Sequence, residues 1–98
     1  MIQLVKLAAF TTWMAELRDK QARDRINARL LRVQRGTLGD VKPVGQGVSE
    51  LRVDYGPGYR VYIKQLGTEI VVLLCGGDKR TQDADIRQAL QLAQTLED

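Results

Sequence analysis

The chain has 98 residues, 44% of them hydrophobic and 28% charged, which is typical of one small globular domain (residues 1–98) rather than a disordered segment. It contains no histidine and one cysteine, Cys75, which excludes an internal disulfide, a cysteine zinc site and any Ser-His or Cys-His nucleophile pair. With a net charge of +3, catalysis would depend on Arg, Lys, Tyr and carboxylate groups, and we expect neither a metal nor another cofactor.

The first third of the chain predicts one strand and two helices. Residues 2–8 alternate partly and are compatible with a β-strand. From Phe10 the apolar spacing becomes helical, and Asp19 can cap a second helix that runs to about Arg35. The two helices are expected to form a hairpin. Their apolar stripes are Phe10, Trp13, Met14 and Leu17 in the first helix, and Ala22, Ile26, Leu30 and Val33 in the second.

The second helix also carries a basic ridge, Arg25, Arg29 and Arg32, on a face separate from its apolar stripe. The ridge is either an ordinary solvated face or a surface for a partner. Trp13 is assigned to the core, because it shares its helical stripe with Phe10 and Leu17.

The rest of the chain predicts three strands and a final helix. Gly36 ends the second helix, and residues 37–47 are interpreted as a loop because they carry Gly39, Pro43, Gly45 and Gly47. Strands follow at 48–54, 59–65 and 69–75, separated by turns at 55–58 and at Gly67 and closed by Gly76-Gly77. A last helix begins at Thr81 or Asp83, with Ile86, Leu90 and Ala93 on its apolar face.

These elements predict an α+β fold in the order β-α-α-β-β-β-α. The helical hairpin and the C-terminal helix would pack against one face of a mostly antiparallel four-stranded sheet. The strand at 69–75 is nearly all apolar, which is typical of a central strand covered on both faces. Cys75, at its end, is expected to be a buried, inert thiol.

Charge is distributed unevenly along the chain. Residues 1–81 hold 14 basic and 8 acidic side chains, whereas residues 82–98 hold Arg87 and four acidic side chains, Asp83, Asp85, Glu97 and Asp98. A basic body suggests a polyanionic ligand, although ordinary solvated charge explains the composition equally well. The longest apolar run, residues 70–75, is too short to span a membrane, and the N-terminus does not resemble a signal peptide, so we expect a cytoplasmic protein.

The polar face of the predicted meander is the main candidate site. Residues two apart in a strand share a face, so Glu50 points with Arg52, and Arg60 with Tyr62 and Lys64. A hairpin about the 55–58 turn makes Arg52 and Arg60 cross-strand neighbours, which are destabilising unless an anion or a carboxylate such as Glu50 relieves them. We therefore expect one concave patch formed by Arg52, Arg60, Lys79 and Arg80, with Tyr55 and Tyr62 near it. The alternative is a merely solvated sheet face.

Ordered motifs along nearly the whole chain carry a resemblance to a known family. They are Glu50-Leu51-Arg52, Gly58-Tyr59-Arg60-Val61-Tyr62 and Gly76-Gly77-Asp78-Lys79-x-Thr81-Gln82, preceded by Phe10-x-x-Trp13-x-x-x-Leu17, Arg29-Leu30 and Gly39-Asp40-x-Lys42-x-Val44-Gly45. In this order they resemble the HigB-type "addiction module killer protein" branch of the RelE/ParE toxin superfamily.

The resemblance implies a RelE-like fold and the toxin of a type II toxin–antitoxin system. Its leading interpretation is a metal-independent endoribonuclease (an mRNA interferase) that cleaves mRNA on the ribosome and arrests translation. Its implied partners are mRNA, the ribosome and a cognate HigA-like DNA-binding antitoxin in a toxin–antitoxin hetero-oligomer, and not a membrane. The alternatives are a ParE-like DNA gyrase inhibitor and a non-catalytic RNA- or antitoxin-binding module.

Cleavage by a ribose 2′-OH needs a base, charge stabilisation at the phosphorane and help for the leaving 5′-oxygen. Arg60 and Arg80 are assigned to the phosphate because guanidinium groups bind it bidentately, and Arg52 supports them. Lys79 positions the phosphate or acts as the acid. Glu50, Tyr55 and Tyr62 remain candidates for the base. Tyr55, Tyr62 and Lys64 are the predicted RNA contacts.

Overall fold

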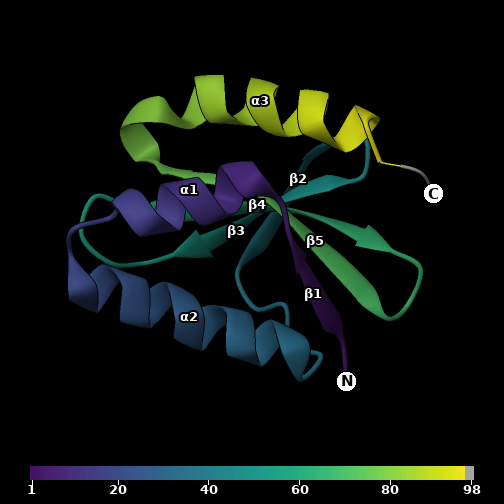
Figure 1. Ribbon diagram of the computed structural model, residues 1–98, viewed down its shortest axis with the longest axis horizontal. Coiled ribbons are helices and arrows are strands. Elements are labelled where there is room, and N and C mark those ends of the chain that lie inside the picture. Colours follow the sequence, from purple (N-terminus) through teal and green to yellow (C-terminus); the bar gives the residue numbers. More distant parts are fainter. Residues whose placement is uncertain (97–98) are drawn as a thin grey trace.

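The computed structural model describes residues 1–96, so Glu97 and Asp98 of the predicted acidic segment lie outside the described residues. A five-stranded sheet lies between helices on both sides (Figure 1). The elements in chain order are β1 (Gln3–Lys6), α1 (Ala8–Glu16), α2 (Lys20–Gln34), β2 (Val41–Gly45), β3 (Val48–Val53), β4 (Tyr59–Leu66), β5 (Ile70–Asp78), a 3₁₀ turn (Lys79–Thr81) and α3 (Gln82–Gln94).

The strands lie in the order β1-β5-β4-β3-β2, antiparallel throughout except for the parallel pair β1–β5. The predicted α+β class and mostly antiparallel sheet are thus confirmed. The predicted strand count was wrong, because β2 lies inside the segment interpreted as a loop. It is an edge strand, where Pro43 is tolerated because its missing N–H faces away from the sheet, and a register shift separates Pro43 from Gly45.

The helices do not cover one face, as the sequence had suggested. Figure 1 shows α3 on one side of the sheet and α2 on the other. Against α2 pack the side chains of one buried cluster, which includes Ile26, Leu51, Val61 and Leu73. Beneath α3 lies a second cluster that includes Tyr62, Leu74 and Ala89. The sheet face that was predicted to be polar is therefore largely covered by α3.

Strand β5 continues through Gly76 and Gly77 instead of ending at Cys75. A Cβ at Gly76 would lie 2.3 Å from Cε3 of Trp13, and one at Gly77 would lie 1.7 Å from Oδ2 of Asp85. The two glycines therefore let α1 and α3 approach opposite faces of the same strand. Trp13 packs against the core and Cys75 is buried, both as predicted.

The helix boundaries follow local signals. The Asp19 carboxylate accepts hydrogen bonds from the backbone N–H groups of Gln21 and Ala22, which confirms the predicted cap of α2. Asp78 caps the 3₁₀ turn in the same way through the N–H of Arg80. Within residues 1–96, no helix is both long enough and apolar enough to cross a bilayer.

Candidate functional site

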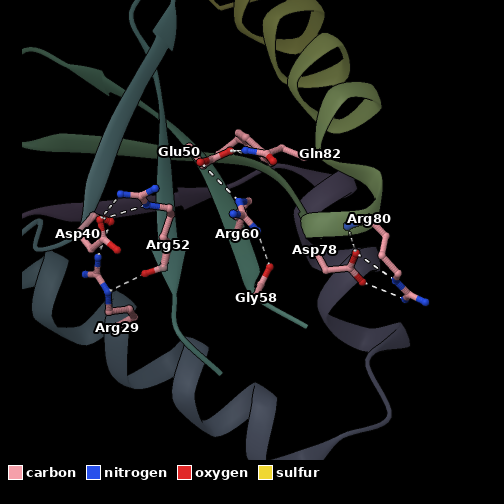
Figure 2. Close-up of polar contacts among 10 residues, drawn as sticks. Arg29, Asp40, Glu50, Arg52, Gly58, Arg60, Asp78, Arg80 and Gln82 are labelled. Carbon is pink, nitrogen blue, oxygen red and sulfur yellow. Dashed lines mark hydrogen bonds and ion pairs between the residues drawn. The ribbon is translucent and has the colours of Figure 1, made fainter. Parts of the chain in front are cut away.

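Two arginines project from neighbouring strands of the sheet, and a third lies in the 3₁₀ turn that follows β5. Arg52 lies on β3 directly opposite Arg60 on β4, which confirms the predicted cross-strand pair. Arg60 in turn is opposite Gly77 on β5, three residues before Arg80. Figure 2 shows Arg60 between the other two, with the Arg80 guanidinium turned away from it.

Each of these arginines has its own carboxylate. Nε and Nη2 of Arg52 donate to Oδ1 of Asp40 at 3.1 and 2.9 Å, and Nη2 of Arg80 donates to Oδ2 of Asp78 at 3.0 Å. The hydrogen bonds from Arg80 lower the pKa of Asp78, and those to Asp40 raise the pKa of Arg52. Arg52 and Asp40 are both accessible to water, so their pair contributes little to stability and an incoming anion can displace Asp40 at small cost. Arg80 is exposed, whereas Asp78 is only 14% exposed and also caps the 3₁₀ turn.

Arg60 is held differently, because its side chain is only 12% exposed. Its Nη1 donates to the carbonyl of Gly58 at 2.7 Å, and its Nε lies 3.5 Å from Oε1 of Glu50. The Nε group is buried and its contact with Glu50 is an ion pair without hydrogen-bond alignment. The guanidinium is therefore anchored along one side.

Glu50 is 1% exposed and lies under the first turn of α3. Its Oε2 accepts a hydrogen bond from the hydroxyl of Tyr62 at 3.1 Å and another from Nε2 of Gln82 at 2.8 Å. Burial and the neighbouring Glu50 carboxylate both raise the pKa of Tyr62. Glu50 and Tyr62 are therefore enclosed beneath α3, which corrects the expectation that they lie on an exposed face of the sheet.

A hollow of about 350 Å³ lies in front of Arg60. Its lining combines the two opposed arginines with two exposed carboxylates and the turn after β3: Asp40, Arg52, Val53, Asp54, Gly58, Tyr59 and Arg60. Asp54 was not among the residues selected from the sequence. Its place at the end of the alternating strand, on the same face as Arg52, was the available signal.

Lys79 and Arg80 line a second hollow, of about 510 Å³, together with Arg87 of α3. The four basic residues thus do not form the single concave patch that was predicted, because Lys79 and Arg80 lie in the 3₁₀ turn beyond the end of β5 and line a separate hollow. The two hollows remain close, since the Cβ of Lys79 lies 3.9 Å from where a Cβ at Gly58 would stand.

The other predicted RNA contacts lie elsewhere. The Tyr55 hydroxyl hydrogen-bonds to Asp19 at 3.1 Å, and its ring stacks on Tyr59 beneath the guanidinium of Arg25, so it joins the turn to α2. Lys64 is opposite Val48 and Val72, four residues along β4 from Arg60. At about 3.3 Å per residue, roughly 13 Å of strand separates it from Arg60.

The middle residue of the predicted basic ridge of α2 does not lie on the exposed face of the helix. Arg29 is buried and donates to three backbone carbonyls, those of Leu38, Asp40 and Arg52, at 2.6, 2.9 and 3.3 Å. It thereby fixes the segment that carries Asp40, the partner of Arg52. Arg25 and Arg32 remain exposed beside a groove of about 620 Å³ between α2 and β3.

No group of three or more His, Cys, Asp or Glu residues within 1–96 is arranged to hold a metal ion.

The chain is 50% identical over 95 residues to an uncharacterized protein of Haemophilus influenzae, and the alignment covers 97% of this chain and 96% of that protein. The chain therefore belongs to the same family as that protein. No family model matches the chain.

Proposed function

We propose that this protein is the toxin of a type II toxin–antitoxin pair and acts as a metal-independent mRNA endoribonuclease on the ribosome. The observation that carries the proposal is the hollow in front of Arg60, where an anchored guanidinium with little exposure to water and a second arginine face the same space. The motifs shared with HigB-type toxins support it, since they include Arg52, Arg60 and Lys79. An antitoxin with DNA-binding ability is the partner that this function requires.

In this mechanism the scissile phosphate sits in the hollow against Arg60, with Arg52 exchanging Asp40 for the phosphate. Two guanidinium groups there stabilise the charge that grows on the phosphorane as the 2′-oxygen attacks phosphorus. The P–O5′ bond breaks, a 2′,3′-cyclic phosphate forms, and the leaving 5′-oxygen takes a proton from Lys79. Arg80 is in the neighbouring hollow and holds the adjoining backbone phosphate.

Asp54 is the group best situated to take the proton from the 2′-hydroxyl. It is exposed and lines the hollow with both arginines, whereas Glu50 is enclosed by Tyr62, Gln82 and Arg60. A base must reach the proton that it removes. We therefore assign Asp54 as the base, and we assign Glu50 to holding Arg60.

The test is to induce the protein without an antitoxin and to map transcript 5′ ends. Wild type is expected to stop growth and to create discrete new ends inside coding regions. Arg60→Ala and Asp54→Asn should lose these ends, and Arg35→Ala, which removes an exposed arginine outside both hollows, should keep them. Growth arrest with intact transcripts and DNA damage signalling would overturn the nuclease in favour of a gyrase inhibitor.

A second candidate is an RNA-binding module without catalysis. One observation favours it: Glu50 and Tyr62, two of the three residues predicted as the base, are buried and not exposed at the surface. Binding of RNA that depends on Arg60, with no growth arrest and no new transcript ends, would select this candidate.

A further inference from the structure

Gln82 is the first residue of α3, and its side-chain amide donates a hydrogen bond to the Glu50 carboxylate behind Arg60. We propose that Gln82 is a positioning residue: its amide fixes the Glu50 carboxylate, and through it the outward orientation of the Arg60 guanidinium. The expected effect on RNA binding rests on the proposed function, whereas the orientation of Arg60 can be measured without RNA.

The argument begins with the cost of a buried carboxylate. Glu50 is 1% exposed, and a buried charge is tolerated only when it is paired and hydrogen-bonded. Tyr62 supplies one donor from the facing strand, and Gln82 supplies the other from the covering helix (Figure 2 draws the Gln82 contact). Both donors act on Oε2, so together they fix the rotation of the carboxylate.

That rotation determines how Arg60 is held. With Oε2 occupied, only Oε1 faces Arg60, at 3.5 Å from Nε and without hydrogen-bond alignment. A free carboxylate instead prefers two parallel hydrogen bonds to a guanidinium. Without the Gln82 amide, Glu50 can rotate to take Arg60 in this way, which draws the guanidinium inward and away from the hollow.

Three variants separate this role from simple packing. Gln82→Leu keeps the bulk of the side chain and removes the donor. Gln88→Leu makes the same change at an exposed position of α3 and is the matched control. Gln82→Glu places a second carboxyl against Glu50. Two adjacent carboxyls share one proton, so the introduced group donates to Glu50 in acid and repels it at higher pH.

The first measurement is the NMR signal of the Arg60 Nε–H group, assigned by its loss in Arg60→Lys. In Gln82→Leu we expect it to move downfield, because Nε gains an aligned hydrogen bond, while Gln88→Leu leaves it unchanged. In Gln82→Glu the signal should resemble wild type near pH 5 and depart from it near pH 8. The titratable groups facing this network are Glu50, Arg60, Tyr62 and Asp85.

The second measurement is affinity for a short 2′-O-methyl RNA, which cannot be cleaved through its 2′-oxygen. Loss of one oriented charge-assisted contact should weaken binding about tenfold in Gln82→Leu, with Gln88→Leu unaffected. A folded Gln82→Leu protein whose Arg60 signal does not move would overturn the positioning role. If the signal moves but neither Gln82→Leu nor Arg60→Ala weakens RNA binding, the positioning role stands and the proposed RNA site fails. If Gln82→Leu does not fold, the Arg60 Nε–H signal of Gln82→Glu decides the question. A signal that resembles wild type near pH 5 and departs from it near pH 8 supports the positioning role, and a signal that does not change with pH overturns it.

Discussion

At the scale of single residues, burial beneath α3 raises the pKa values of Cys75 and Tyr62. Cys75 is 2% exposed, and burial, with a smaller contribution from Asp85, raises the pKa of its thiol from 9.0 to about 12. Tyr62 lies in the same buried cluster, and its pKa is raised above 10.0 for the same reason and by the carboxylate of Glu50. Both groups are neutral when protonated, so the fold favours their protonated forms.

The sign of the resulting pH dependence follows from proton uptake. In the unfolded chain Cys75 loses its proton near pH 9, whereas in the folded protein it keeps the proton to about pH 12. Its contribution to stability is therefore complete below pH 9 and is lost as the pH rises toward 12, because the unfolded state then binds fewer protons. Tyr62 adds a loss of the same sign that begins near pH 10.

We therefore expect Cys75→Ala to be less sensitive to alkali than wild type. In urea unfolding, the stability advantage of wild type over the variant should shrink by about 1.4 kcal/mol for each pH unit above roughly 9. The comparison cancels the titration of Tyr62 and of the surface lysines. Two stability curves that stay parallel from pH 7 to 10.5 would mean that Cys75 does not titrate differently in the folded state.

The sequence had placed Glu50 and Tyr62 correctly along the strands but not in depth. Alternation was sufficient to predict that Arg52 faces Arg60 and that Glu50 shares their face, because the side-chain period of a strand is fixed. Burial depends on which helix lies above, and the amphipathic pattern of α3 does not specify the face of the sheet that it covers. This is why Glu50 and Tyr62 were expected at the surface.

At the scale of elements, the glycine pair of β5 is what lets helices pack on both faces of the sheet near the arginines. The indole of Trp13 occupies the space where a side chain at Gly76 would stand. At Gly77 the obstruction is the end of the Asp85 side chain, which can rotate after breaking its 2.5 Å hydrogen bond from Thr81. Gly76 is thus the more constrained of the two.

Gly76→Ala is expected to destabilise the protein by about 3 kcal/mol, because a large ring in a packed core must move. Gly67→Ala is the control: it has φ +64 and no neighbour within 4 Å, so it should cost only the backbone strain of about 1 kcal/mol. Urea unfolding gives both values, and the fluorescence of the single tryptophan should change only in Gly76→Ala. Equal costs with unchanged fluorescence would contradict this account.

The strand β2 shows where local signals were insufficient. Residues 37–47 contain glycines and a proline, which favour a loop, and the segment has only Leu38, Val41 and Val44 as large apolar residues. It nevertheless pairs with β3, with Val41 opposite Leu51 and Lys42 opposite Glu50. Arg29, from α2, fixes the segment before β2 through the carbonyls of Leu38 and Asp40 and joins it to β3 through the carbonyl of Arg52, and such long-range contacts are not visible in a local pattern.

At the scale of the whole molecule, the net charge of the chain is modest, and four of its arginines, Arg52, Arg60, Arg80 and Arg87, line two neighbouring hollows. Net charge alone attracts a polyanion from any direction, whereas phosphates bound in the hollows depend on particular side chains. Arg52 and Arg80 already have carboxylate partners, so RNA must displace Asp40 and Asp78 to bind there. Salt dependence distinguishes these two kinds of attraction.

For a single-stranded RNA, the logarithm of the affinity should fall linearly with the logarithm of the salt concentration, with a slope near 0.7 per phosphate contact. Arg52→Gln should therefore reduce the magnitude of the slope by about 0.7, because one contact is lost. Arg35→Gln removes the same charge from the exposed end of α2, outside both hollows, and should leave the slope nearly unchanged. Fluorescence anisotropy between about 50 and 200 mM salt measures both slopes. Equal slopes for the two variants would mean that RNA responds to the overall charge and not to the hollow in front of Arg60.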